Sequence, residues 1–196
     1  MNEHTKFTSL HAKIRGIATA GSAKAFAGVI YRYTSSKHRT AQQMMSGIGA
    51  HRAGGRWNAP GTFHPVYCAS NPALANREHF ASCSRAGLPL HSVMPLMGKA
   101  VRVNLSMVLD LRDSGVLKQL GVTTSQLRAD RWREATDSGD ESLCQAIGRA
   151  AFLAGFEGLI TPSAEAEKSG DFNIVLVLEN APESSGKWFV LRGGSK

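Results

Sequence analysis

The sequence has few cysteines and no long apolar run. Its 196 residues include three cysteines, Cys68, Cys83 and Cys144, which are widely spaced and odd in number. Neither a disulfide framework nor a CxxC metal-binding pair is indicated, and a reducing compartment fits this usage. No stretch reaches the ~18 apolar residues of a membrane span, and residues 1–16 lack the apolar centre of a cleaved signal peptide. We therefore expect the protein to act in the cytoplasm, without a membrane partner.

Several catalytic signatures are absent as well. The patterns GxSxG, GxGxxG and the P-loop do not occur, which argues against a serine hydrolase, a Rossmann dinucleotide site and a nucleoside triphosphatase. The seven histidines include no HExxH pair. Because there is no CxxC pattern either, we expect no zinc site.

Acidic residues are almost missing from the first part of the chain. Residues 1–77 carry ten Lys or Arg against the single acid Glu3, a balance of +9, whereas residues 78–196 balance to −1. Such a positive field could attract nucleic acid, an acidic protein or a polyphosphate ligand, or it could be a solvated basic surface. Aromatic residues make up only 7%, and helix-turn-helix, RRM and zinc-finger signatures are missing. Direct nucleic-acid binding is therefore the less favoured alternative.

Helical and strand-like patterns alternate along the chain. Hydrophobic residues are 42% and charged residues 19%, which is typical of a folded soluble domain. We predict strands over residues 27–34, 64–70, 98–106, 158–163, 173–179 and 187–192. We predict helices over residues 72–85, 114–121, 123–132 and 142–158. The stretch from Gln42 to Gly55 reads as a loop.

These patterns predict a single compact α+β domain over residues 26–196, with small mixed sheets flanked by helices. Residues 1–25, rich in Ser, Thr, Ala and Lys, are expected to form an N-terminal arm or extension, either loosely held or a short helix.

The segment AGGRWNAPGTFHPVYCASNPALANREHF, residues 53–80, concentrates residues that could carry chemistry. Gly54 and Gly55 permit a sharp turn or a close approach of the backbone to a ligand. Arg56 follows, and its planar guanidinium suits bidentate phosphate binding. Arg32, near the end of an earlier predicted strand, could supply a second guanidinium. A glycine pair before an arginine also occurs in simple turns with a surface arginine.

Glu78 falls on the inward side of the predicted helix over residues 72–85. It follows Leu74 by four positions and precedes Ala81 by three, so its carboxylate shares a stripe with apolar residues. An ionised group in such a place needs a partner or a chemical role. The structural alternative to a catalytic role is a salt bridge to Arg77 or Arg85 at the helix edge.

Three further polar residues follow or end predicted strands. The ring of Tyr67 could stack on a flat base while its hydroxyl bonds a polar group, although most such tyrosines belong to the core. Ser163 could cap the turn after its strand, and Asn173 could be a plain turn residue.

In this order the motifs resemble the RES-domain toxin family, which is named for an Arg, a Glu and a Ser. The resemblance covers about residues 29–180 and rests on the segments IYR, GGRWNAPG, VYCAS, ALANREHF, QAIGRAAFLAGFEGLITPSAE and DFNIVLVLEN. The block GGRWN…Y…E is specific in both residue type and spacing.

The resemblance implies an NAD-consuming enzyme with an ADP-ribosyltransferase-like α+β fold, acting as the toxin of a toxin–antitoxin pair. A cognate antitoxin would then be a partner, NAD the substrate, and no metal would be required. The family's functional residues match Arg32 and Arg56 for the pyrophosphate, Tyr67 for stacking near the nicotinamide, Glu78 for the ribosyl cation, and Ser163 and, less strongly, Asn173 for the polar wall.

The acceptor of the ADP-ribosyl group stays open between water, inorganic phosphate and a protein side chain. An inactive relative that only binds an antitoxin is a further alternative to an enzyme.

Overall fold

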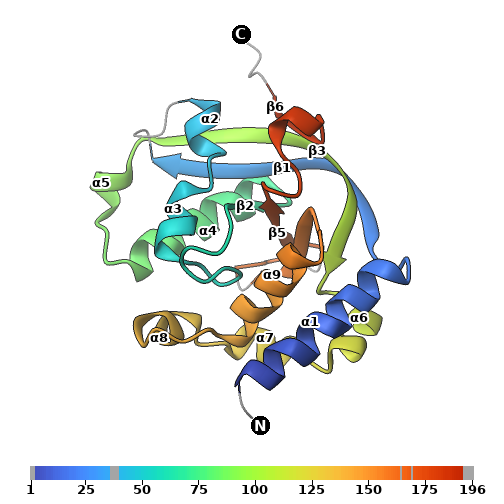
Figure 1. Cartoon of the computed structure of the whole chain (residues 1–196). Coiled ribbons are helices and arrows are strands. Elements are labelled where there is room, and N and C mark those ends of the chain that lie inside the picture. The colour runs from blue at the N-terminus through green and yellow to red at the C-terminus, as the bar shows by residue number, and fades with distance from the viewer. Residues whose placement is uncertain (1–2, 36–39, 164, 169, 192–196) are drawn as a thin grey trace.

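A six-stranded mixed sheet forms the centre of the part of the chain that the structure describes (Figure 1). The structure is a computed structural model and describes residues 3–35, 40–163, 165–168 and 170–191. The strands are β1 (Lys24–Ser35), β2 (Pro65–Ala69), β3 (Leu96–Asp110), β4 (Gly158–Pro162), β5 (Phe172–Val177) and β6 (Trp188–Val190). Their order is β1-β2-β5-β4-β3-β6, and β1 also pairs with β3. The first five strands therefore close a ring of hydrogen-bonded neighbours.

Strands β1 and β3 form a long antiparallel pair within this ring. The register places Ile30 opposite Val101 and Arg32 opposite Lys99. Tyr31 pairs with Ala100 on one side and with Ala69 of β2 on the other. The β3–β4 pair is parallel, while the other strand pairs are antiparallel. This arrangement brings the C-terminal half of β1 next to β2.

Two sets of helices cover the sheet. The helices are α1 (Glu3–Thr19), α2 (Ala41–Met44), α3 (Ile48–Ala53), α4 (Pro72–Arg85), α5 (Leu90–Val93), α6 (Ser114–Leu120), α7 (Thr124–Ala129), α8 (Trp132–Asp137) and α9 (Leu143–Leu153), with a 3-10 turn at Glu183–Ser185. Helices α1, α6, α7 and α9 gather on one side, and α4 lies against β1 and β2 (Figure 1). The apolar face of α9 fills the larger core, because Ile147, Ala150 and Ala151 are fully buried there.

Helix α4 begins and ends where the sequence predicts. Asn71 caps it, since its side-chain oxygen accepts a 2.9 Å hydrogen bond from the backbone N–H of Leu74. Pro72 occupies the first turn, where its missing N–H leaves no donor unpaired. Leu74 is completely buried beneath the helix. The cap thereby fixes the rotation of the helix and the side from which Glu78 projects.

The single α+β domain is confirmed, and two local predictions are wrong. Of the two alternatives for the N-terminal arm the helix is the one observed, because residues 3–19 form a helix with Leu10, Ile14 and Ile17 in the main core. The predicted loop contains α2 and α3, and the helix predicted to reach residue 158 ends at Leu153. Within the described residues, no helix combines the length and apolar character that crossing a membrane requires.

Candidate active site

A pocket of about 570 Å³ opens where α4, β1, β2, β5, α8 and the segment after α3 meet. Ser163 lies directly behind one wall, bonded to the side chain of Glu78. The other predicted site residues line the pocket: Arg32, Arg56, Tyr67, Glu78 and Asn173. The structure thus brings together residues from five separate parts of the chain.

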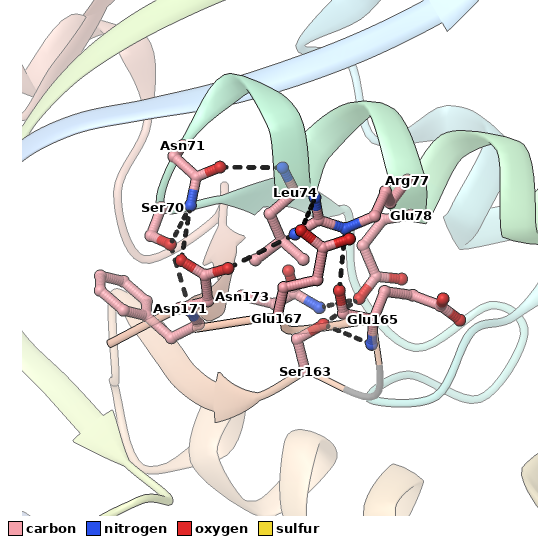
Figure 2. A network of polar contacts seen from close by, with 11 residues as sticks. Ser70, Asn71, Leu74, Arg77, Glu78, Ser163, Glu165, Glu167, Asp171 and Asn173 are labelled. Atoms are coloured by element: carbon pink, nitrogen blue, oxygen red, sulfur yellow. Dashed lines mark hydrogen bonds and ion pairs between the residues drawn. The ribbon is translucent and has the colours of Figure 1, made fainter. Parts of the chain in front are cut away.

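One carboxylate oxygen of Glu78 is held by two side chains (Figure 2). Its Oε1 accepts a 2.6 Å hydrogen bond from Ser163 Oγ and a 2.5 Å bond from Asn173 Nδ2. Ser163 directly follows β4, and Asn173 is the second residue of the adjacent β5, so both donors lie beside the ends of two neighbouring strands. The second oxygen, Oε2, accepts no hydrogen bond from any residue that the structure describes. Glu78 therefore presents one free acceptor at the pocket wall.

The salt bridges considered for Glu78 at the helix edge are absent among the described residues. Arg77 instead contacts Glu167 at 3.1 Å and Asp171 at 3.4 Å, and its Nε donates to the backbone oxygen of Glu165. Figure 2 shows these contacts between α4 and the segment that links β4 to β5.

Arg85 is engaged elsewhere too, because it pairs with the Glu165 carboxylate at 3.1 Å. Both arginines thus hold the segment that carries Ser163 and leave the carboxylate of Glu78 unneutralised.

Three buried polar atoms that face no partner among the described residues belong to this pocket. They are Arg32 Nε, Thr34 Oγ1 and Asn173 Oδ1. A carboxylate can only accept, so the amide nitrogen of Asn173 must face Glu78 and its oxygen must point elsewhere. Buried polar groups are normally paired, and each unpaired one costs about 1 to 3 kcal/mol. A polar ligand in the pocket would satisfy these atoms.

The two predicted arginines are both anchored to backbone carbonyls. Arg32 Nη1 donates to the backbone oxygen of Tyr67 at 2.7 Å, and Arg56 Nη1 donates to that of Leu127 at 2.9 Å. Burial lowers the pKa of Arg32, and nearby Cys68 and Tyr67 oppose that shift. Each guanidinium has N–H donors besides the one that bonds the carbonyl. Each group is therefore held in its orientation and keeps donors that can bind a ligand.

The hydroxyl of Tyr67 has a structural role that the sequence did not reveal. It accepts from the backbone N–H of Trp57 at 3.0 Å and donates to Asn58 Oδ1 at 2.8 Å. Burial raises the pKa of Tyr67, so the neutral phenol is favoured. A Cβ on Gly55 would lie 2.5 Å from this hydroxyl, so the close approach predicted for the glycine pair is to Tyr67. The hydroxyl fixes the loop that carries Arg56.

Helix α9 supports the same loop from beneath. Gln145 is fully buried, and its amide donates to Gly55 O at 3.1 Å and to Thr136 Oγ1 at 2.8 Å. Gly148 lies so close that a Cβ there would stand 1.7 Å from Trp57 O. Sequence reasoning missed both residues, although a glycine inside an apolar helix is a recognisable signal of close packing.

Other pocket residues were also missed, namely Arg85, Trp132 and Arg133. His79 and Cys83 share the wall with them, with Cys83 Sγ 3.6 Å from His79 Nε2. Burial, followed by the charge of Arg32, lowers the pKa of His79.

Within the described ranges, no group of three or more His, Cys, Asp or Glu side chains could hold a metal ion.

The fold and the order of these motifs along the chain define a known class of domain. The RES domain family matches residues 29–187, and the chain belongs to this family.

Among its relatives, the NAD(+) phosphorylase MbcT of Mycobacterium tuberculosis (strain H37Rv) is 29% identical over 136 residues, which are 68% of this chain and 66% of the relative. MbcT of Mycobacterium bovis gives the same values. The match thus spans about two thirds of the length of these relatives. The crystal structure of the M. tuberculosis MbcT–MbcA toxin–antitoxin complex contains a similar fold, with a TM-score of 0.68 and 25% identity over 93% of this chain and 91% of that chain.

Proposed function

We propose that this protein is a toxin that degrades NAD by cleaving the bond between nicotinamide and ribose, with inorganic phosphate as the acceptor. Its membership of the RES domain family and its similarity to proteins named NAD(+) phosphorylase support this proposal. Of the residues expected for NAD binding, Arg32, Arg56, Tyr67 and Asn173 line a single pocket, and Ser163 lies behind its wall, bonded to Glu78.

The observation that carries the proposal is the geometry of Glu78. Its Oε1 is fixed by Ser163 and Asn173, and Oε2 is left without a partner among the described residues. A carboxylate held in this way is preorganised to face positive charge, which is the strongest single means of stabilising a charged transition state. A simple helix-edge salt bridge would have placed Arg77 or Arg85 against this carboxylate, and both arginines pair with other acids instead.

The reaction balances without a metal or a redox partner. The bond between ribose C1′ and the nicotinamide nitrogen breaks, and its electron pair leaves with nicotinamide as a neutral base. The ribose becomes oxocarbenium-like, and a phosphate oxygen forms the new bond to C1′. The products are nicotinamide and ADP-ribose 1″-phosphate. In this scheme Glu78 stabilises the developing cation and bonds ribose hydroxyls.

The remaining predicted residues position the substrate. Arg32 and Arg56 bind the pyrophosphate with their free N–H groups, since guanidinium groups form strong charge-assisted bonds to phosphate. Asn173 Oδ1 accepts a hydrogen bond from NAD, which satisfies this buried and otherwise unpaired atom. Tyr67 holds the loop of Arg56 through its hydroxyl, and its ring contributes to the wall near the nicotinamide.

The acceptor is tested by mass spectrometry of the products formed from NAD with and without inorganic phosphate. We expect nicotinamide together with ADP-ribose 1″-phosphate when phosphate is present. Free ADP-ribose as the sole product would show that water is the acceptor, so the reaction would be hydrolysis and not phosphorolysis. An added ADP-ribosyl mass on a protein would make the protein a modifying enzyme. No release of nicotinamide under any condition would contradict the proposal as a whole.

A cognate antitoxin is the proposed protein partner, because the similar solved structure is a toxin–antitoxin complex. Expression of the chain in bacteria should lower the NAD pool and arrest growth, and coexpression of the antitoxin should prevent both. Growth arrest with a constant NAD pool would rule out NAD depletion as the cause.

A further inference from the structure

The described lining of the pocket carries more positive than negative charge. Four arginines, Arg32, Arg56, Arg85 and Arg133, face it, against two carboxylates, Glu78 and Glu165. Of the six, only Arg85 and Glu165 pair with each other. Three guanidinium groups and the Glu78 carboxylate are therefore not neutralised by an ion pair within the described residues.

Three of these arginines belong to one end of the pocket. Arg85 is the last residue of α4, Arg133 lies in the first turn of α8, and Arg56 is on the loop after α3. Burial, and then the positive charges of Arg85 and Arg56, lower the pKa of Arg133. Glu165 pairs with Arg85 alone, so this group of three cations keeps a positive excess, and a bound anion would offset that excess.

The guanidinium of Arg133 is held in position by an aromatic ring. Its Cζ lies 4.1 Å from the ring centroid of Trp132, which also lines the pocket. A cation–π contact of this kind orients the flat group and leaves its edge N–H donors available. Arg85 is oriented by Glu165, and Arg56 by its bond to Leu127 O. All three guanidinium groups are thus preorganised.

We propose that Arg85 and Arg133 join Arg56 in a phosphate-binding subsite at the end of the pocket formed by the end of α4 and the start of α8, which extends the pair of Arg32 and Arg56. A tetrahedral oxyanion carries several acceptor oxygens and up to two negative charges, which three guanidinium groups can match. Glu165 lowers the net charge at this subsite, which favours exchange of the bound anion over permanent retention.

Two sources could supply this phosphate group. One is the inorganic phosphate that acts as acceptor under the proposed function, and the other is the pyrophosphate of NAD. The identity of the source rests on the proposed function, but the existence of the subsite does not, because phosphate binding is measurable without turnover.

Calorimetric titration separates these cases. Inorganic phosphate is titrated into the full-length protein without NAD, and NAD is titrated into Glu78→Gln protein, which is expected to turn over too slowly to disturb the measurement. Each titration is repeated with Arg133→Gln. The variant Arg128→Gln is the matched control, since Arg128 is exposed, lies on neighbouring α7 and does not line the pocket.

We expect Arg133→Gln to weaken one of the two ligands by about tenfold or more, the loss typical of a charge-assisted contact. Weaker phosphate binding with unchanged NAD binding assigns the subsite to free phosphate, and the reverse assigns it to the pyrophosphate. Unchanged binding of both ligands would overturn the subsite. An equal loss of affinity in Arg128→Gln would also overturn it, because the effect would then come from the general positive charge of the protein and not from a contact in the pocket. Failure of the wild-type protein to cleave NAD would contradict the proposed function alone.

Discussion

The hydroxyl of Ser163 donates a 2.6 Å hydrogen bond to Glu78 Oε1 across 85 positions of the chain. Ser163 Oγ in turn accepts from the backbone N–H of Glu165 at 3.0 Å, which fixes the direction in which the hydroxyl donates. The orientation of a carboxylate on α4 is therefore set by the segment that follows β4. The proposed chemistry depends on this link between α4 and the end of β4.

Ser163→Ala should lower kcat for nicotinamide release by about tenfold with a smaller change in KM, because a hydrogen bond to a charged group contributes ~1.5 to 3 kcal/mol. Ser185→Ala is the control, since its hydroxyl also accepts from the backbone N–H two residues further on but lies in an exposed turn away from Glu78. Steady-state kinetics on both variants checks the prediction. Wild-type kcat in Ser163→Ala would show that Glu78 needs no orientation by this residue.

Arg77→Ala should release the segment that links β4 to β5. The guanidinium contacts Glu165 O, Glu167 and Asp171, and the side chain of Asp171 is only 8% exposed. Removing it should cost about 1 to 3 kcal/mol of unfolding free energy, because a buried carboxylate loses a partner.

Amide exchange in residues 165–168 should become faster in Arg77→Ala, and kcat should fall with it. The control is Arg131→Ala, since the pair of Arg131 with Glu134 is exposed on both sides. Unchanged exchange together with unchanged kcat would remove Arg77 from the support of the site.

Gly148→Ala should destabilise the protein by about 3 kcal/mol or more, because a Cβ at that place would lie 1.7 Å from Trp57 O and force a backbone shift. Gly16→Ala is the matched control, since nothing lies within 4 Å of a Cβ there. An alanine inside an exposed helix turn is expected to stabilise by ~0.5 to 1 kcal/mol. Chemical denaturation of both variants measures the difference, and similar unfolding free energies would contradict the close approach.

Much of the fold followed from local patterns, and the misses have physical causes. The helix over residues 72–85 was predicted to the residue, because Asn71 and Pro72 are strong local start signals. The sequence of α1 gives a weak signal, and its burial depends on α6 and α9, which lie far along the chain. Tertiary packing of this kind is not readable from a short window.

The same distinction holds for the candidate site. Arg56, Tyr67 and Glu78 belong to one sequence block, so their spacing could be recognised. Arg85 and Arg133 line the pocket from the end of α4 and the start of α8, and no local motif marks either of them. Whether such a residue lines the pocket depends on how the helices and strands pack in three dimensions, and not on its neighbours in the sequence.

The stability of the pocket should depend on pH through His79. Burial, and then the charge of Arg32, keep the pKa of His79 below its usual value of 6.5. The unfolded chain therefore binds a proton more readily, so this contribution to stability is complete above pH 6.5 and is lost as the pH falls through the folded pKa. The unfolding free energy of the wild type should fall between pH 7 and pH 5. His79→Asn should make this fall less steep, by at most ~1.4 kcal/mol per pH unit for one proton. Denaturation at both pH values checks this, and identical slopes in the variant and the wild type would contradict it.

The Glu78→Gln variant separates a catalytic carboxylate from a structural one, because it keeps the size and reach of the side chain and deletes its charge. Nicotinamide release and melting temperature are measured on the same preparation. If Glu78 stabilises the ribosyl cation, kcat falls by about 10² to 10³ fold, while NAD affinity and the melting temperature change little. A stable Glu78→Gln protein with wild-type kcat would contradict the account.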